Sequence, residues 1–118
     1  MISHLLKVTF AFLVFTFLAF IIPSVVIADS EKSSRKEIKD AEYYYNLGVD
    51  CANSDKYQEA IDAFKQAIRI KPDYALAHYR LGCTYLILGD KDSVMEEYKI
   101  LKRLDKEKAN ILFNKIYP

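Results

Sequence analysis

Leu47-Gly48 recurs as Leu81-Gly82 thirty-four residues later, and the flanking residues recur in register without a gap. Identical residues pair at four other places along this offset, and residues of similar size pair at two more. The pairs are Ala41 with Ala75, Tyr45 with Tyr79, Lys65 with Lys99, Arg69 with Arg103, Ala60 with Val94, and Phe64 with Tyr98. A fixed period of this length is typical of a repeat protein.

Each glycine of the repeated pair stands inside helical sequence, where glycine costs about 1 kcal/mol relative to alanine. We therefore expect it to serve close packing of two helices. In the first unit, a second helix carrying Ala60 lies against Gly48, and Phe64 fills the gap one turn further on. The corresponding residues of the second unit are Gly82, Val94 and Tyr98.

The period resembles the tetratricopeptide repeat family, which has the order aromatic, Leu-Gly, aromatic, alanine, aromatic and proline. The resemblance covers Ala41 to about Lys108, with one repeat at 41–74 and another at 75–108. It implies an all-α fold of helix-turn-helix units, stacked as a right-handed α-solenoid. The second repeat departs from the pattern twice, because Lys106 replaces the proline and His78 replaces the large aromatic residue.

Five helices are predicted. A Ser34-x-x-Glu37 capping box starts the first helix within the segment 29–40, which is a charged lead-in and helix start, and this helix ends near Asn53. The second helix ends near Ile70 before Pro72, the third ends at Leu88 before Gly89, and a closing helix occupies 105–117. The predicted N-terminal caps of the last four helices are Asp55, Asp73, Asp90 and Asp105. We expect the closing helix to cover the second repeat with Ala109, Leu112, Phe113 and Ile116.

The first twenty-eight residues have the pattern of a signal peptide. Lys7 precedes a run from Val8 to Ile22 that is apolar except for two threonines, and cleavage is expected after Ala28. The alternative is an uncleaved membrane anchor, because Val8 to Ala28 approaches the roughly 20 residues that span a bilayer. The predicted location is therefore periplasmic or secreted, or membrane-anchored with the repeats outside the cytoplasm.

Charge and length limit the remaining possibilities. Removing Lys7 from 17 basic residues leaves 16, which balance the 16 acidic residues. Interleaved neutral charge argues against nucleic-acid binding and against a polybasic membrane patch. Removing 28 residues from 118 leaves 90, enough for one modest domain.

No catalytic or metal-binding motif is present in the sequence, so neither a cofactor nor an enzymatic activity is predicted. His78 is interpreted as a packing residue, because a metal site needs ligands that do not accompany it. Cys51 and Cys83 match no metal spacing and are interpreted as small packing residues. A disulfide between them is the alternative.

The resemblance places a protein-binding surface on the concave side, formed by the first helix of each repeat. Members of the family that grip a terminal carboxylate use Lys, Arg and Asn there, whereas this surface is mostly apolar and aromatic. An amphipathic helix or a hydrophobic segment of another protein suits such a surface better. Its residues are Glu42, Tyr45, Val49, Ala52 and Asn53 from the first repeat, and Leu76, Tyr79, Cys83, Leu86 and Ile87 from the second.

These features predict an exported, non-catalytic scaffold that binds an envelope protein. Two repeats are fewer than the three or so that usually suffice for a stable stack, which favours self-association or completion by a partner. One alternative is a structural component anchored by an uncut N-terminal helix. Another is an accessory domain of a redox or metal enzyme with a reactive thiol at Cys83.

Overall fold

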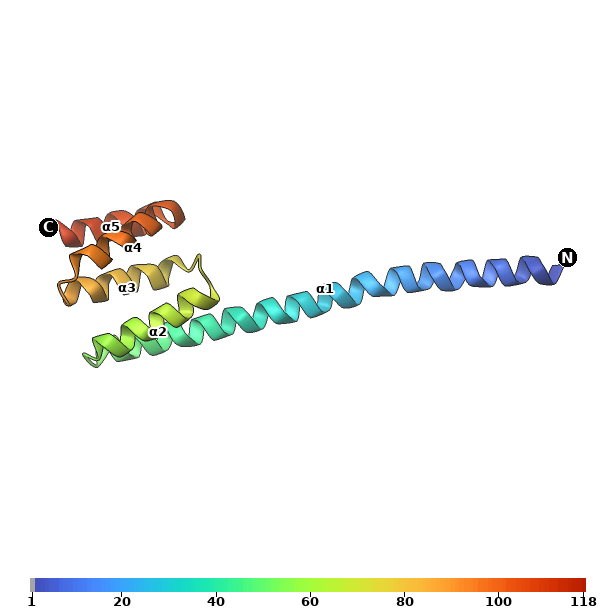
Figure 1. Ribbon diagram of the computed structural model, residues 1–118, viewed down its shortest axis with the longest axis horizontal. Coiled ribbons are helices and arrows are strands. Elements are labelled where there is room, and N and C mark those ends of the chain that lie inside the picture. The colour runs from blue at the N-terminus through green and yellow to red at the C-terminus, as the bar shows by residue number, and fades with distance from the viewer. Residues whose placement is uncertain (1) are drawn as a thin grey trace. The chain divides into compact units, whose positions relative to one another are not determined.

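The computed structural model describes the backbone of residues 2–118 and the side chains of residues 28–118 (Figure 1). It contains five α-helices, and the described residues form no strand, so the predicted all-α helical repeat fold is confirmed. The chain divides into two units, Met1–Lys36 and Glu37–Pro118, and the second holds both repeats. The helices are α1 (Ile2–Asn53), α2 (Tyr57–Ile70), α3 (Ala75–Ile87), α4 (Lys91–Leu104) and α5 (Lys106–Ile116).

The segment predicted to direct export, residues 1–28, lies outside the described side chains except for Ala28. Within residues 28–118, whose side chains the structure describes, no helix combines the length and the apolar character needed to cross a membrane.

The predicted start of the first helix at Ser34 is wrong. Helix α1 runs through Ser34 and Glu37 without interruption. Neither glycine nor proline occurs between Asp29 and Leu47, so no residue there ends the hydrogen-bonded helix. The Ser-x-x-Glu spacing signals a helix start only where the preceding chain leaves the helical conformation.

Two of the four predicted aspartate caps are confirmed. The carboxylate of Asp90 accepts a hydrogen bond from the Ser93 amide at 3.1 Å, and Asp105 accepts one from the Lys108 amide at 3.1 Å. Gly89 has a φ of 77°, as expected for the left-handed residue after a helix. The third helix ends at Ile87, one residue before the predicted end.

The predicted caps Asp55 and Asp73 are wrong. Asp55 adopts a positive φ of 61° in the turn, a conformation that aspartate tolerates, and its carboxylate accepts a hydrogen bond from the Tyr57 hydroxyl. Lys56 precedes α2 and Tyr74 precedes α3, and neither side chain caps its helix.

The helices of the first hairpin meet at Gly48. A Cβ atom on this glycine would lie 2.6 Å from Cε1 of Phe64, whose side chain is fully buried. Phe64 therefore makes the close contact for which Ala60 was predicted, although Ala60 is also fully buried in the same cluster. The glycine accordingly lets an aromatic ring approach the backbone of α1.

At Gly82 the close neighbour is the closing helix. A Cβ atom there would lie 2.8 Å from a methyl carbon of Leu112 on α5, and 3.4 Å from Cβ of Glu97. The nearest atoms thus belong to Leu112 and Glu97, and the predicted neighbour, Val94, is buried in the cluster that also contains Leu112. Leu112 reaches Gly82 because α5 packs against both α3 and α4.

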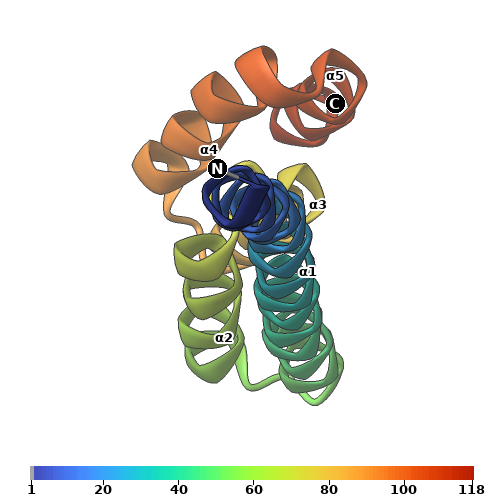
Figure 2. The same ribbon diagram turned by 90° about the vertical axis from the view of Figure 1, so that its right-hand side faces the viewer.

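Helix α5 covers the second repeat, as the sequence predicted. Figure 2 shows α5 beside α4. The side chains of Ala109 and Leu112 are buried in the cluster that α5 forms with its neighbours. Phe113 departs from the prediction, because 39% of its surface is exposed. Its ring packs between those of Tyr98 and Tyr117, with ring centroids 5.5 and 5.0 Å away.

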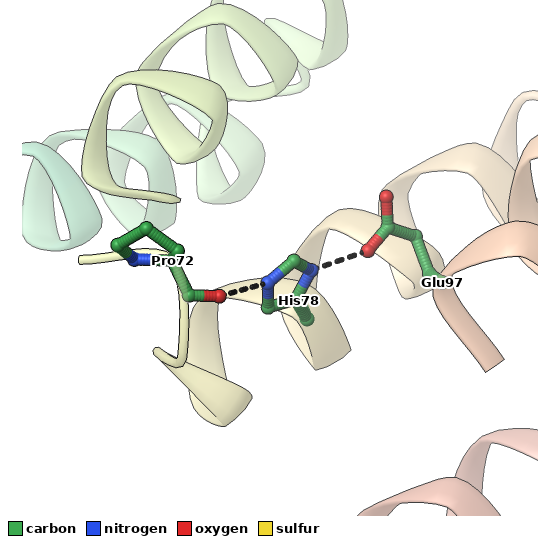
Figure 3. A network of polar contacts seen from close by, with 3 residues as sticks. All are labelled: Pro72, His78 and Glu97. Carbon is green, nitrogen blue, oxygen red and sulfur yellow. Dashed lines mark hydrogen bonds and ion pairs between the residues drawn. The ribbon is translucent and has the colours of Figure 1, made fainter. Parts of the chain in front are cut away.

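His78 is buried, as a packing residue should be, but it also joins three segments through polar contacts (Figure 3). Its Nδ1 lies 2.7 Å from a carboxylate oxygen of Glu97, and its Nε2 lies 2.9 Å from the carbonyl oxygen of Pro72. Both partners accept hydrogen bonds, so both contacts form together when the ring is protonated and donates from both nitrogens. Burial lowers the pKa of His78, but the hydrogen bonds to Glu97 and Pro72 outweigh it and raise the pKa above its ordinary value.

Candidate protein-binding site

A cavity of about 160 Å³ lies between the C-terminal part of α1 and the C-terminal half of α3. Its walls are about equally polar and apolar, and Ile87, one of the apolar lining residues, is 61% exposed. Phe64 of α2 also lines the cavity, so α1, α2 and α3 all contribute to its walls. The lining residues are Val49, Ala52, Asn53, Tyr57, Phe64, Arg80, Cys83, Thr84 and Ile87.

Five residues predicted for the concave surface line this cavity. Val49, Ala52 and Asn53 come from α1, and Cys83 and Ile87 come from α3. Valine and cysteine occupy equivalent positions of the two repeats, thirty-four residues apart, which is why stacking brings them to the same cavity. Whether this cavity binds a partner stays a prediction.

Tyr45 lies next to the cavity wall and does not line it. Its hydroxyl accepts a hydrogen bond from Nε of Arg80 at 3.4 Å. Its ring packs beside those of Phe64 and Tyr74, with centroid distances of 6.0 and 5.4 Å. Tyr45 thus holds the α3 arginine that forms part of the cavity.

Tyr79 and Leu86 were predicted for the same surface, but they pack against the second core cluster. This cluster includes Leu112 of the closing helix, which takes up part of the α3 surface that was expected to face a partner. Leu76 is half-buried and does not line the cavity, and Glu42 is exposed outside it. The apolar surface open to a partner is therefore smaller than the predicted one.

Sequence reasoning missed Arg80 and Thr84 as members of the site. The Thr84 hydroxyl donates a hydrogen bond to the Arg80 carbonyl at 2.8 Å, and both residues line the cavity. A usable signal was present, because Arg80, Thr84 and Ile87 follow the i, i+4, i+7 spacing of one helix face. Arg80 gives the cavity one positive charge.

Both cysteines are free thiols in the structure, so the alternative of a disulfide is not realised. Burial raises the pKa of the Cys83 thiol, although a hydrogen bond with Tyr79 and the charges of Lys115 and Arg80 oppose this shift. A raised pKa keeps the thiol protonated at neutral pH, and the protonated form is a poor nucleophile. The environment of Cys83 therefore disfavours a role as a reactive thiol.

The chain matches repeat profiles and is similar to known proteins. Residues 52–89 match a family profile described as TPR repeat, and residues 75–108 match one described as tetratricopeptide repeat. The chain is 38% identical over 50 residues to the peroxisomal targeting signal receptor of Candida albicans, a match that covers 42% of this chain and 8% of the receptor. It is 34% identical over 61 residues to an uncharacterized protein of Methanocaldococcus jannaschii, covering 52% of this chain and 71% of that protein. The chain therefore spans only a small part of the receptor's length, whereas it covers most of the length of the Methanocaldococcus jannaschii protein. Together with the repeat profiles, these matches show that the chain belongs to the tetratricopeptide repeat family.

Proposed function

We propose that this chain is an exported, non-catalytic module that binds another envelope protein through the cavity between α1 and α3. Tetratricopeptide repeats suggest a protein–protein interaction module. The observation that carries the proposal is a cavity, formed where two repeats stack, whose lining includes the strongly exposed apolar side chain of Ile87. Apolar surface of this kind marks interaction sites when it lies in a groove.

The size of the cavity favours a protein ligand. Pockets for drug-sized molecules usually enclose about 300 to 1,000 Å³, whereas this cavity encloses about 160 Å³. It therefore accommodates one large apolar side chain, which anchors a helix or a hydrophobic segment of the partner. Arg80 then favours a carboxylate or a carbonyl oxygen of the partner beside that anchor.

The likeness to a receptor named for a targeting signal supports recognition of a peptide segment by these repeats. Support for export comes from the first twenty-eight residues, where an apolar run follows Lys7 and short side chains precede Asp29. Cleavage after Ala28 would release the repeats outside the cytoplasm, where an envelope protein is the available partner.

Affinity capture of the tagged chain from its native cells tests this function, with mass spectrometry of the bait and of the proteins that accompany it. We expect a bait that begins at Asp29 and one stoichiometric partner. An intact Met1 terminus in the membrane fraction would instead indicate the anchored structural component.

Matched variants connect the captured partner to the cavity. Ile87→Asp should abolish capture, because it places a charge at an apolar anchor site. Leu88→Asp is the control, since Leu88 is 49% exposed, adjacent in sequence and absent from the cavity lining. Equal capture by both variants would show that the partner binds elsewhere, provided that helical circular dichroism is unchanged in both.

A further inference from the structure

A second apolar surface lies on the first hairpin, between α1 and α2, where no repeat precedes it within the unit Glu37–Pro118. A cavity of about 320 Å³ there is lined by Tyr44, Leu47, Cys51 and Ala63. Two exposed acidic residues, Glu59 and Asp62, also line it, as does Gln66. We call these seven residues the end face. The end face shares no residue with the cavity between α1 and α3.

The second repeat has a surface equivalent to the end face, and that surface is covered. Thirty-four residues after Leu47 stands Leu81, which is 2% exposed, whereas Leu47 is 39% exposed. Leu81 is buried because it joins a core cluster with Ile61 and Phe64 of α2. The same repeat surface is thus covered by a helix in the second repeat and uncovered in the first.

Helix α2 shows what a ligand of the end face must look like. Its residues Ile61, Phe64 and Ile68 follow the i, i+3, i+7 spacing and pack in the cluster that contains Leu81. Lys65 projects from the same helix, with its Nζ 6.0 Å from the centre of the Tyr85 ring. The helix that covers the second repeat therefore presents an apolar ridge with a lysine beside it.

The acidic residues of the end face also favour a ligand with basic residues. Glu59 and Asp62 attract lysine or arginine on an incoming helix. They disfavour a symmetric contact between two end faces, because such a contact brings the acidic residues of both copies together. Terminal repeats of a stack usually present a polar outer surface, so an apolar face here is explained by a ligand that covers it.

From this internal comparison we propose that the end face binds an amphipathic helix of another protein, with an apolar i, i+3, i+7 ridge flanked by lysine or arginine. The helix lies across Leu47 as α2 lies across Leu81. This second interaction is separate from the proposed function, and it gives the module two different partners or two contacts with one partner.

A labelled peptide that carries the α2 sequence, residues 56–71, is the probe, and its fluorescence anisotropy is measured with the whole chain. We expect saturable binding that weakens about tenfold or more in Leu47→Asp, since an apolar anchor becomes a charge. Leu104→Asp is the matched control, because Leu104 is 40% exposed and lies outside the end face. The pair Glu59→Lys and Asp62→Lys should weaken binding several-fold, and added salt should do the same for the natural chain.

Cysteine alkylation places the peptide on the protein. Bound peptide should slow modification of Cys51, which lines the end face, and leave the rate at Cys83 unchanged. Binding that survives Leu47→Asp or leaves Cys51 unprotected would overturn the proposal. A different result would also overturn it: the chain does not bind the peptide but forms a dimer, and Leu47→Asp makes that dimer monomeric. A second copy of the chain would then be the occupant of the end face. Ile87→Asp should leave peptide binding unchanged, which separates this result from that of the proposed function.

Discussion

Replacing Gly48 by alanine tests the packing of the first hairpin. The new methyl group would lie 2.6 Å from Cε1 and 2.7 Å from Cδ1 of Phe64, a ring with no exposed surface in a cluster with Ile61 and Leu81. Overpacking of a core costs about 1 to 3 kcal/mol, and such a short contact with a confined ring belongs at the upper end. Alanine regains about 1 kcal/mol of helix propensity. The net loss in the free energy of unfolding is therefore about 2 kcal/mol.

Urea unfolding followed by circular dichroism measures this loss of unfolding free energy. In thermal unfolding, the same loss should lower the Tm by about 8 to 16 °C in a domain of this size. A second substitution, Phe64→Leu, shortens the side chain that meets the methyl group. Its effect combined with Gly48→Ala should be smaller than the sum of the two single effects, since the residues touch. Gly89→Ala is the control: nothing lies within 4 Å of a Cβ there, so its cost arises from the positive φ and should simply add to that of Phe64→Leu. Strict additivity for Gly48→Ala, or unchanged stability, would refute the packing account.

Three other outcomes are expected. Leu112→Ala should cost about 2 to 5 kcal/mol in urea unfolding, because it empties the fully buried site against Gly82, and a cost no greater than that of Phe113→Ala would contradict the position of α5. Because the folded-state pKa of His78 is raised, its contribution to stability is complete below pH 6.5 and disappears as pH rises through the folded pKa; unfolding at pH 6 and pH 9 should show this decrease, and His78→Gln should remove it. Asp105→Ala should lower the Tm and speed amide exchange in the first turn of α5, whereas unchanged exchange would argue against the cap.

The helices were predictable where proline, glycine and capping residues coincided. Pro72 follows the end of α2, and Gly89 follows α3 in the left-handed conformation. Asp55 was misassigned because its side chain suits both a cap and a left-handed turn position, and only the backbone path decides between them.

The candidate site was predictable only in part. The thirty-four-residue offset correctly places Val49 and Cys83 at one cavity, because equivalent positions of stacked repeats face the same side. The offset says nothing of where the closing helix docks, and the cluster to which that helix contributes partly covers Tyr79 and Leu86. Burial depends on neighbours that differ at the two ends of a stack.

A different kind of information was needed for the end face. Leu47 and Leu81 are the same residue at the same repeat position, and no local pattern distinguishes them. Their exposures of 39% and 2% differ because α2 covers only the second. An uncovered interface in a repeat protein is therefore recognised by comparing equivalent positions within the structure.

Site-specific photocrosslinking in native cells tests the central claim most directly, namely that the cavity between α1 and α3 binds another protein. A benzoyl-phenylalanine is introduced at position 87, which lines the cavity, or at position 88, which is exposed beside it. The account predicts one discrete crosslinked partner from position 87 and none from position 88. The same products from both positions, or no product from position 87, would contradict it.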